Sequence, residues 1–125
     1  MEIKRLLTNI CTQDLSASKT FYCALFDFKV SYNSDWFINL YSAARGLELG
    51  LISCTSEVVP TQAVGTIRGA YLTFVVEDVE ALHKQASTLG YPILQAPILT
   101  SYGQTRMLLN APEGTICDVS SPTNN

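Results

Sequence analysis

Apolar and polar residues alternate in short runs along the chain, and two longer stretches instead repeat their apolar residues with helical spacing. Alternating runs are typical of β-strands, and in the first half of the chain we expect strands at residues 3–12, 28–33, 36–41 and 47–52. In the second half we expect them at residues 70–76, 91–97, 103–110 and 115–121. Each half is therefore predicted to hold a strand, a helix and then three more strands.

The two predicted helices begin at polar residues that can cap them. Asp14 or Ser16 can accept hydrogen bonds from the first N–H groups of one helix, and Asp78 can do so for the other. The buried stripe is expected to consist of Leu15, Ser18, Phe21, Tyr22 and Leu25 in the first helix and of Val79, Leu82, Ala86 and Leu89 in the second. Asp27 and Gly90 are expected to end the helices, because both residue types tolerate the left-handed conformation.

This order of elements occurs twice, and an internal repeat predicts two similar modules. We expect an α+β fold in which two βαβββ modules form a curved mixed sheet around a cleft, with both helices on the other face. The whole chain, residues 1–125, is predicted to be a single domain. Its parts are a first module at about 3–58, a linker at about 59–69 and a second module at about 70–121.

The hairpin formed by residues 36–41 and 47–52, with the loop Ser42–Gly46, supplies the first candidate for a functional surface. Strand side chains alternate between faces, so one face of its second strand carries leucines and the other carries Glu48, Gly50 and Ile52. The leucines, which we assign to the core, are Leu47, Leu49 and Leu51. A carboxylate and a glycine within an apolar strand have no obvious packing role, and we therefore expect their face to line the cleft.

Alternation on the other strands adds further residues to the predicted cleft. These are Leu7, Asn9 and Cys11; Tyr71, Thr73 and Val75; Arg106, Leu108 and Asn110; and Ile116, Asp118 and Ser120. The ligand-binding candidates among the cleft and hairpin residues are Trp36, Glu48, Tyr71, Arg106, Asp118 and Asn9. Arg106 needs an acid or water in such a strand, and Glu48 and Asp118 are the candidate acids. A purely structural ion pair and a ligand-binding role are both open for these charges.

Composition and charge narrow the possible partners. The chain has 125 residues, a net charge of −3 and only 15% charged residues, which disfavours nucleic acid as a partner. No apolar run is long enough to span a bilayer, and the N-terminus lacks the apolar region of a signal peptide, so we expect a cytoplasmic protein with no membrane partner. The four cysteines are scattered without a CxxC pair and are expected to be buried, reduced thiols.

Several motifs give the chain a resemblance to a known family. They are TxxDLxxSxxFY in residues 12–22, LELGL in residues 47–51, the strand-to-helix turn Val76-Glu77-Asp78, and APEGTICDV in residues 111–119. Together with the repeat, which spans residues 5–120, they resemble the vicinal oxygen chelate superfamily. That superfamily includes glyoxalase I, extradiol dioxygenases, fosfomycin-modifying enzymes and bleomycin-binding resistance proteins. The resemblance implies the fold expected above and a homodimer joined along sheet edges.

The resemblance also implies where a metal would be held. Metal-dependent members place His, Gln or Glu on the first strand of each module and a carboxylate on the last. In this chain the first-strand places fall on Leu7 and Tyr71, and the last-strand places fall on Glu48 and Asp118. Two carboxylates without imidazole suit iron, nickel or zinc poorly, and we expect no cofactor and no transition metal. A weakly held, oxygen-coordinated divalent cation remains compatible with this set.

Three functions follow as hypotheses. The first is a metal-independent binding protein of the bleomycin-resistance type, which sequesters a small aromatic or cationic compound, as in antibiotic resistance. The second is a lyase or isomerase of the glyoxalase type with Glu48 as general base. The third is a scaffold that retains no ligand.

Overall fold

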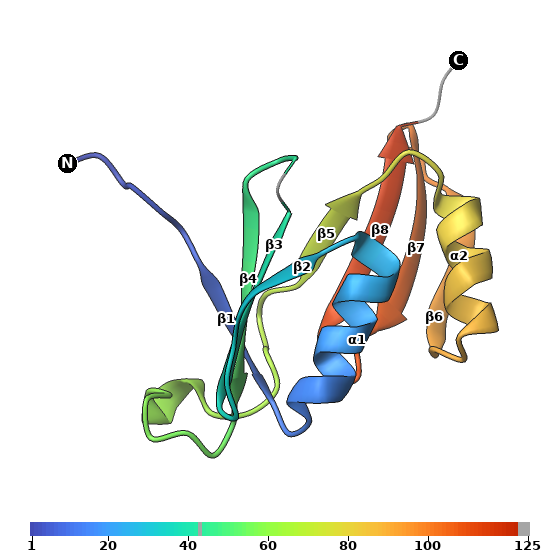
Figure 1. The fold of residues 1–125 in the computed structure, drawn as a ribbon. Helices are drawn as coiled ribbons and strands as arrows, with labels where there is room; N and C mark the ends of the chain where they lie inside the picture. The colour runs from blue at the N-terminus through green and yellow to red at the C-terminus, as the bar shows by residue number, and fades with distance from the viewer. Residues whose placement is uncertain (43, 123–125) are drawn as a thin grey trace. The chain divides into compact units, whose positions relative to one another are not determined.

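The computed structural model of the protein describes residues 1–42 and 44–122. Ala43 of the predicted hairpin loop and the last residues of the predicted domain, 123–125, lie outside the described residues. The elements in chain order (Figure 1) are β1 Thr8–Thr12, α1 Leu15–Phe26, β2 Lys29–Asn33, β3 Phe37–Ser42, β4 Leu47–Ser53, the 3₁₀ turn η1 Thr61–Ala63, β5 Leu72–Val75, α2 Val79–Thr88, β6 Ile93–Leu99, β7 Gln104–Asn110 and β8 Ile116–Pro122.

The strands are hydrogen-bonded into two four-stranded sheets, one for each predicted module. Their orders are β1-β4-β3-β2 and β5-β8-β7-β6. In each sheet the module's first strand runs parallel to its last strand, and the other neighbours are antiparallel. The chain divides into two compact units, Met1–Ile67 and Arg68–Asn125, called here the first and second unit. The α+β class and the two βαβββ modules are confirmed.

Both helices begin and end as their sequences predict. The carboxylate of Asp14 accepts a hydrogen bond from the backbone N–H of Ala17 at 3.0 Å, and Asp78 accepts one from Ala81 at the same distance. Asp14 rather than Ser16 is therefore the cap of α1. Asp27 ends α1 in the left-handed conformation with φ of 59°. The short acidic side chain makes this tolerable where most residues would be strained.

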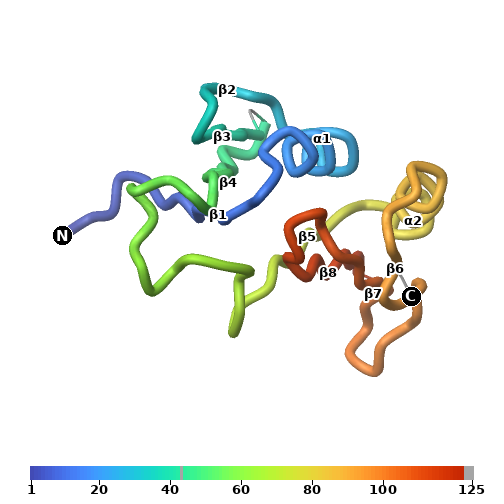
Figure 2. The backbone as a smooth tube through the Cα atoms, turned by 90° about the horizontal axis from the view of Figure 1, so that it is seen from below, coloured from blue at the N-terminus to red at the C-terminus, as the bar shows by residue number. Residues whose placement is uncertain are grey.

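Each unit buries its own core between one face of its sheet and its helix. α1 packs on β3 and β4, while α2 packs on β6, β7 and β8. Figure 2 shows each helix lying along one side of the sheet of its own unit. The buried apolar side chains include Ile10, Phe21, Tyr22, Leu25, Ile38, Leu40, Leu49 and Leu51 in the first unit and Val79, Leu82, Ala86, Met107, Leu109 and Val119 in the second. The opposite face of each sheet is left for other contacts.

The first strand is shorter than predicted. It begins at Thr8 rather than at residue 3. Thr8, the first residue of β1, pairs with Leu49, only two residues after β4 begins at Leu47, so this register could carry the ladder back no further than Leu6. Residues before Leu6 would have no β4 residue beside them with which to form strand hydrogen bonds. Leu47 itself, predicted to be in the core, is 54% exposed because it stands at the end of β4 next to the hairpin loop.

The cysteine prediction is correct in one part and wrong in another. All four cysteines lie within the described residues, and none is joined in a disulfide. Cys117 is buried, but Cys11, Cys23 and Cys54 are only half-buried. Cys11 follows the exposed phase of β1, the same alternation that exposes Asn9, and this phase explains its partial exposure.

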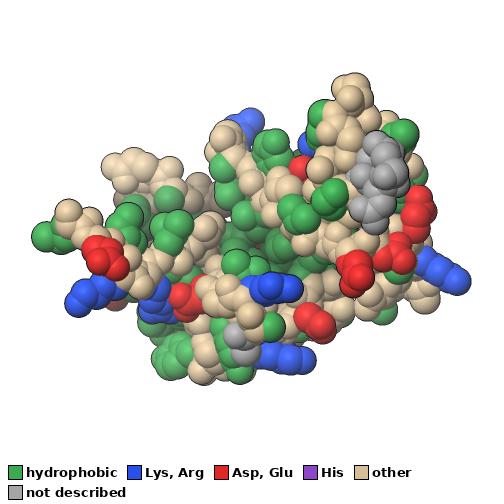
Figure 3. Space-filling model, turned by 90° about the horizontal axis from the view of Figure 1, so that it is seen from above, with side chains coloured by type: hydrophobic (Ala, Val, Ile, Leu, Met, Phe, Trp, Pro, Cys, Tyr) green, Lys and Arg blue, Asp and Glu red, His purple; other side chains and the backbone are tan. Residues whose placement is uncertain are grey.

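One face of the molecule shows positive and negative side chains mixed together (Figure 3), and the helices are too short to span a membrane in the described part of the chain. On the face drawn in Figure 3, Lys and Arg side chains are interspersed with Asp and Glu rather than gathered together. Within residues 1–42 and 44–122, neither helix is long and apolar enough to cross a membrane.

Candidate functional site

The sheet face turned away from α1 carries the polar groups of the first unit. Register places Asn9 of β1 beside Gly50 of β4, and Tyr41 of β3 beside Glu48. Asn39 lies on the same face, opposite Gly50. Side chains from three neighbouring strands therefore meet on one surface, as the alternation predicted for Asn9 and Glu48.

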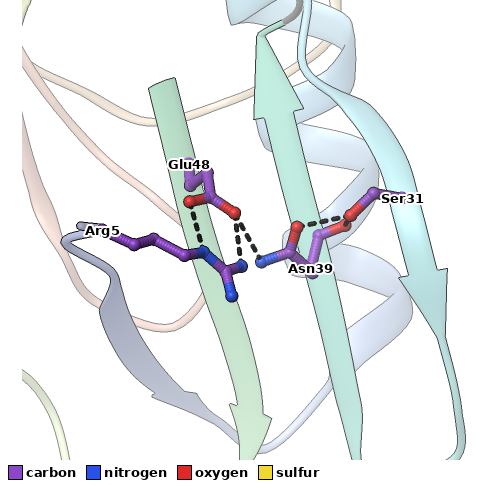
Figure 4. A network of polar contacts seen from close by, with 4 residues as sticks. All are labelled: Arg5, Ser31, Asn39 and Glu48. Atoms are coloured by element: carbon purple, nitrogen blue, oxygen red, sulfur yellow. Dashed lines mark hydrogen bonds and ion pairs between the residues drawn. The ribbon is translucent and has the colours of Figure 1, made fainter. Parts of the chain in front are cut away.

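Glu48 is held by a cation that the sequence analysis did not identify. Arg5, from the segment before β1, donates from Nε to Glu48 Oε2 at 2.6 Å and from Nη2 to Glu48 Oε1. Figure 4 shows the guanidinium edge facing both carboxylate oxygens. The Arg5 side chain is 59% exposed and that of Glu48 is 22% exposed. This is the paired, fork-like geometry that makes arginine a specific partner for carboxylates.

A second side of the carboxylate is supported from β3 and β2. Asn39, which is buried, donates from Nδ2 to Glu48 Oε1 at 3.5 Å. Ser31 in turn donates its hydroxyl proton to Asn39 Oδ1, and Figure 4 shows the resulting row of polar groups. Ser31 stands at a β-bulge between Val30 and Tyr32, which turns its side chain toward Asn39. The bulge thus places Ser31 to orient the Asn39 amide, which in turn donates to Glu48.

These contacts favour the charged form of Glu48. The hydrogen bonds from Arg5 are the largest cause of a pKa of Glu48 below its ordinary value, and the charge of Arg5 and the bond from Asn39 act in the same direction. Desolvation of the carboxylate opposes them by raising the pKa. The pKa of Arg5 is raised by the same bond. Glu48 is therefore an ionised hydrogen-bond acceptor near neutral pH.

An open groove lies where this pair meets the N-terminal segment. Its volume is about 560 Å³, and it is lined by residues 3–6, Thr8 and residues 46–48. The lining combines the charges of Lys4, Arg5 and Glu48 with the apolar side chains of Leu6 and Leu47. A volume of this size lies within the range of small-molecule sites.

Gly50 is the glycine that the sequence analysis singled out, and the structure gives it a packing role. A Cβ at this position would overlap Asn9 Oδ1 and would stand 3.0 Å from Phe37 Cε1. The absence of a side chain therefore lets Asn9 and Phe37 close over β4 from both neighbouring strands.

The corresponding face of the second unit carries its own ion pair. Arg106 donates from Nε to Asp118 Oδ1 at 3.0 Å, and Thr73 donates its hydroxyl proton to Asp118 Oδ2 at 3.0 Å. Asp118 is buried, with 7% of its surface exposed. The hydrogen bond to Asp118 is the largest cause of a raised pKa of Arg106, against the opposing effect of burial. Of the two acids proposed as partners of Arg106, the structure therefore selects Asp118.

The two carboxylates do not stand at equivalent places in the two sheets, contrary to the sequence-based assignment. Asn9 and Thr73 lie equally far before their helix caps, and they pair with Gly50 and Asp118 respectively. Gly50, rather than Glu48, is the counterpart of Asp118. Glu48 lies one repeat of the strand alternation away on the same face.

The remaining candidates directly precede strands, and the structure does not bring Trp36 beside Glu48: the backbone carbonyl of Trp36 accepts from the N–H of Ser53, at the opposite end of β4. Tyr71 directly precedes β5 and is 58% exposed. Trp36 directly precedes β3 and is 39% exposed, and its ring centroid lies 5.7 Å from that of Phe37. Arg5 and Asn39 were not among the site residues predicted from the sequence. Arg5 follows the same alternation as Leu7 and Asn9 along the predicted first strand, and this spacing could have identified it. Asn39 could have been identified as a polar amide within an apolar strand.

The donor set does not fit the metal that the resemblance implies. Among residues 1–42 and 44–122, no group of three or more His, Cys, Asp or Glu side chains is placed to hold a metal ion. Leu7 and Tyr71 occupy the first-strand places, and Glu48 and Asp118 are each bonded to a guanidinium group. A guanidinium competes with a cation for the same oxygens, so we assign no step to a metal.

Solved structures share this fold. A glyoxalase/bleomycin resistance protein/dioxygenase family enzyme from Burkholderia phytofirmans is 25% identical and superimposes with a TM-score of 0.78, covering 93% of this chain and 96% of that one. A lactoylglutathione lyase from Agrobacterium tumefaciens is 16% identical with a TM-score of 0.71, over 94% and 92% of the two chains. An integron cassette protein of Vibrio cholerae is 20% identical with a TM-score of 0.73, over 97% of each chain.

Sequence comparison assigns the family. No curated protein matches the chain at a significant level. The sequence profile of the Glyoxalase/Bleomycin resistance protein/Dioxygenase superfamily, however, matches residues 4–117. This match covers nearly the whole chain, both modules included, and agrees with the fold of the solved structures. The chain belongs to the glyoxalase/bleomycin resistance protein/dioxygenase superfamily.

Proposed function

We propose that the protein binds a small cationic or aromatic compound without a metal, in the manner of the bleomycin-resistance branch of its superfamily. The observation that carries the proposal is the state of the two acids. Glu48 and Asp118 are each bonded to an arginine of their own unit. Such carboxylates are already directed toward cations and are poorly placed to chelate a transition metal.

The enzymatic alternative requires Glu48 to accept a proton from a substrate. A general base works best when its pKa lies near the working pH. Here the hydrogen bonds from Arg5 lower the pKa of Glu48 and occupy both of its oxygens. This arrangement weakens Glu48 as a base and leaves it well suited to hold a positive charge.

The proposal is tested by identifying what the purified protein carries. We expect mass spectrometry of denatured wild type to detect a cationic or aromatic compound that Glu48→Gln loses. Glu57→Gln, which removes an equal charge at an exposed position of the same unit, is expected to retain it. Losing a charge-assisted contact lowers affinity roughly ten- to a hundredfold.

Elemental analysis of the same samples separates the binding protein from the enzyme. We expect less than one equivalent of zinc, nickel, iron or manganese. One equivalent that disappears in Glu48→Gln would overturn the proposal and support the lyase or isomerase. The absence of any Glu48-dependent compound or metal would support the scaffold that retains no ligand.

We further propose that the protein is a homodimer. Each sheet has two edge strands, and an edge with unpaired backbone groups favours pairing with another strand. Pro97 interrupts the edge strand β6, whereas β1 and β5 contain neither proline nor a charged residue. Sedimentation at micromolar concentration should give about twice the 13.7 kDa of one chain. A monomer at high concentration would refute the dimer.

A further inference from the structure

Arg5 reaches Glu48 from outside the sheet. The residues before Thr8 belong to no strand, and the Arg5 side chain is 59% exposed. Its guanidinium can therefore leave the carboxylate without breaking a strand pair or opening the core. Exposed ion pairs of this kind contribute little to stability, so their partners exchange readily.

The geometry of the contact is specific for one chemical group. Two N–H groups of Arg5, at Nε and Nη2, face the two oxygens of Glu48. A planar guanidinium or amidinium presents two such donors side by side, whereas an ammonium is a point charge with rotating donors. The site therefore matches the shape as well as the charge of a guanidinium.

The acceptor has support that does not depend on Arg5. Glu48 stands on β4, an inner strand of its sheet, and Asn39 supports the carboxylate from β3. Asn39 is buried and is itself fixed by Ser31 at the bulge. None of these contacts passes through Arg5, so the carboxylate is preorganised for an incoming donor pair.

We infer that the Glu48 site takes ligands with a guanidinium or amidinium group, and that Arg5 is a built-in occupant which such a ligand displaces. The inference rests on the proposed binding function and names its ligand class. The groove beside Glu48 receives the rest of the ligand along Leu6 and Leu47. The apparent affinity for the ligand is therefore the intrinsic affinity multiplied by the fraction of molecules in which Arg5 has left the carboxylate.

The test is a titration of the full-length, ¹⁵N-labelled protein with phenylguanidine, and with benzylamine as the ammonium of similar size. In wild type, saturation with phenylguanidine should shift the Nε–H signal of Arg5 to that of a solvent-exposed arginine. Arg5→Ala should bind phenylguanidine roughly two- to fivefold more tightly, the range expected for loss of an exposed ion pair. Arg45→Ala, which removes an exposed arginine of the hairpin loop, should bind as wild type does.

Glu48→Gln should bind phenylguanidine at least tenfold more weakly than wild type, and benzylamine should bind more weakly than phenylguanidine to wild type and to Arg5→Ala, a preference that Glu48→Gln should lose. Unchanged affinity in Arg5→Ala, or an Arg5 signal that does not move at saturation, would overturn the inference. So would failure of phenylguanidine to bind while other compounds bind in a Glu48-dependent way, a result that leaves the proposed function standing. If no compound in a broad screen binds through Glu48, both fail together.

Discussion

Glu48 and Asp118 are both carboxylates on inner strands, and both bond an arginine, but the origin of the arginine differs. Asp118 is buried and receives its bonds from β7 and β5, the two strands that flank it. Glu48 is more exposed and receives its strongest bonds from a segment outside the sheet. An ion pair within the ladder is part of the fold, whereas an ion pair from outside it can open while the fold persists. We therefore expect the same chemistry to serve structure in the second unit and exchange in the first.

The largest expected effect is the loss of the cation in the second unit. Arg106→Met keeps the side-chain length but leaves Asp118 buried without its counter-charge. Removing one partner of a buried pair costs several kcal/mol, and because the Arg106 side chain is 28% exposed we expect a loss of about 2 kcal/mol. Urea unfolding followed by circular dichroism measures it.

The matched variant is Arg5→Met, which makes the same change at the exposed pair. It should leave the unfolding midpoint nearly unchanged. Arg106→Met combined with Asp118→Asn should recover part of the stability, because no charge is then stranded. Equal losses in Arg106→Met and Arg5→Met would contradict the comparison.

A smaller effect is expected at Gly50, the counterpart of Asp118 in the first unit. Gly50→Ala places a Cβ against Asn9 Oδ1 and the ring of Phe37. Overpacking costs typically 1–3 kcal/mol, and since Asn9 can rotate away we expect about 1 kcal/mol. Thermal melts should show that adding Asn9→Ala restores much of the loss. No improvement from Asn9→Ala would assign the strain to Phe37 alone.

The smallest effect concerns the titration of Glu48. Because its pKa is lowered in the folded protein, its contribution to stability is present above its unfolded pKa, near 4.5, and is lost as the pH falls through the folded value. Since the pair is exposed, the change in stability is small, but the pKa itself is measurable from the carboxyl carbon by NMR. Arg5→Met should raise this pKa toward 4.5, whereas Arg106→Met should leave it unchanged. If the pKa of Glu48 were the same in wild type and Arg5→Met, Arg5 would not be its partner in solution.

Local signals predicted the fold well. The caps Asp14 and Asp78, the left-handed Asp27 and the repeated order of elements depend on a few neighbouring residues, and the structure contains each of them. The extent of β1 depends on how far β4 reaches on the other side of the ladder. A sequence pattern cannot show that, and the predicted strand was therefore too long.

The site was harder to predict for a geometric reason. Alternation along a strand shows which face a side chain lies on, but not which residue of the neighbouring strand it stands beside. A shift by two residues leaves the side chain on the same face. Glu48 and Gly50 differ by such a shift, so the pattern could not tell which of them corresponds to Asp118. Arg5 was missed because the segment before β1 belongs to no strand, and its contact with Glu48 appears only in the folded chain.

The pairing of Gly50 with Asn9 also limits which sequences can follow from this one. An acid at position 50, matching Asp118 in the other module, would bring a Cβ into the space that Asn9 Oδ1 occupies. Substituting Asn9 first, by a shorter residue, would uncover the glycine and remove a polar group from the face before any acid replaces it. Making the two modules alike at this position therefore requires changes at both residues, and either change made alone alters the packing over β4. This mutual dependence favours the persistence of the difference between the two halves of the chain.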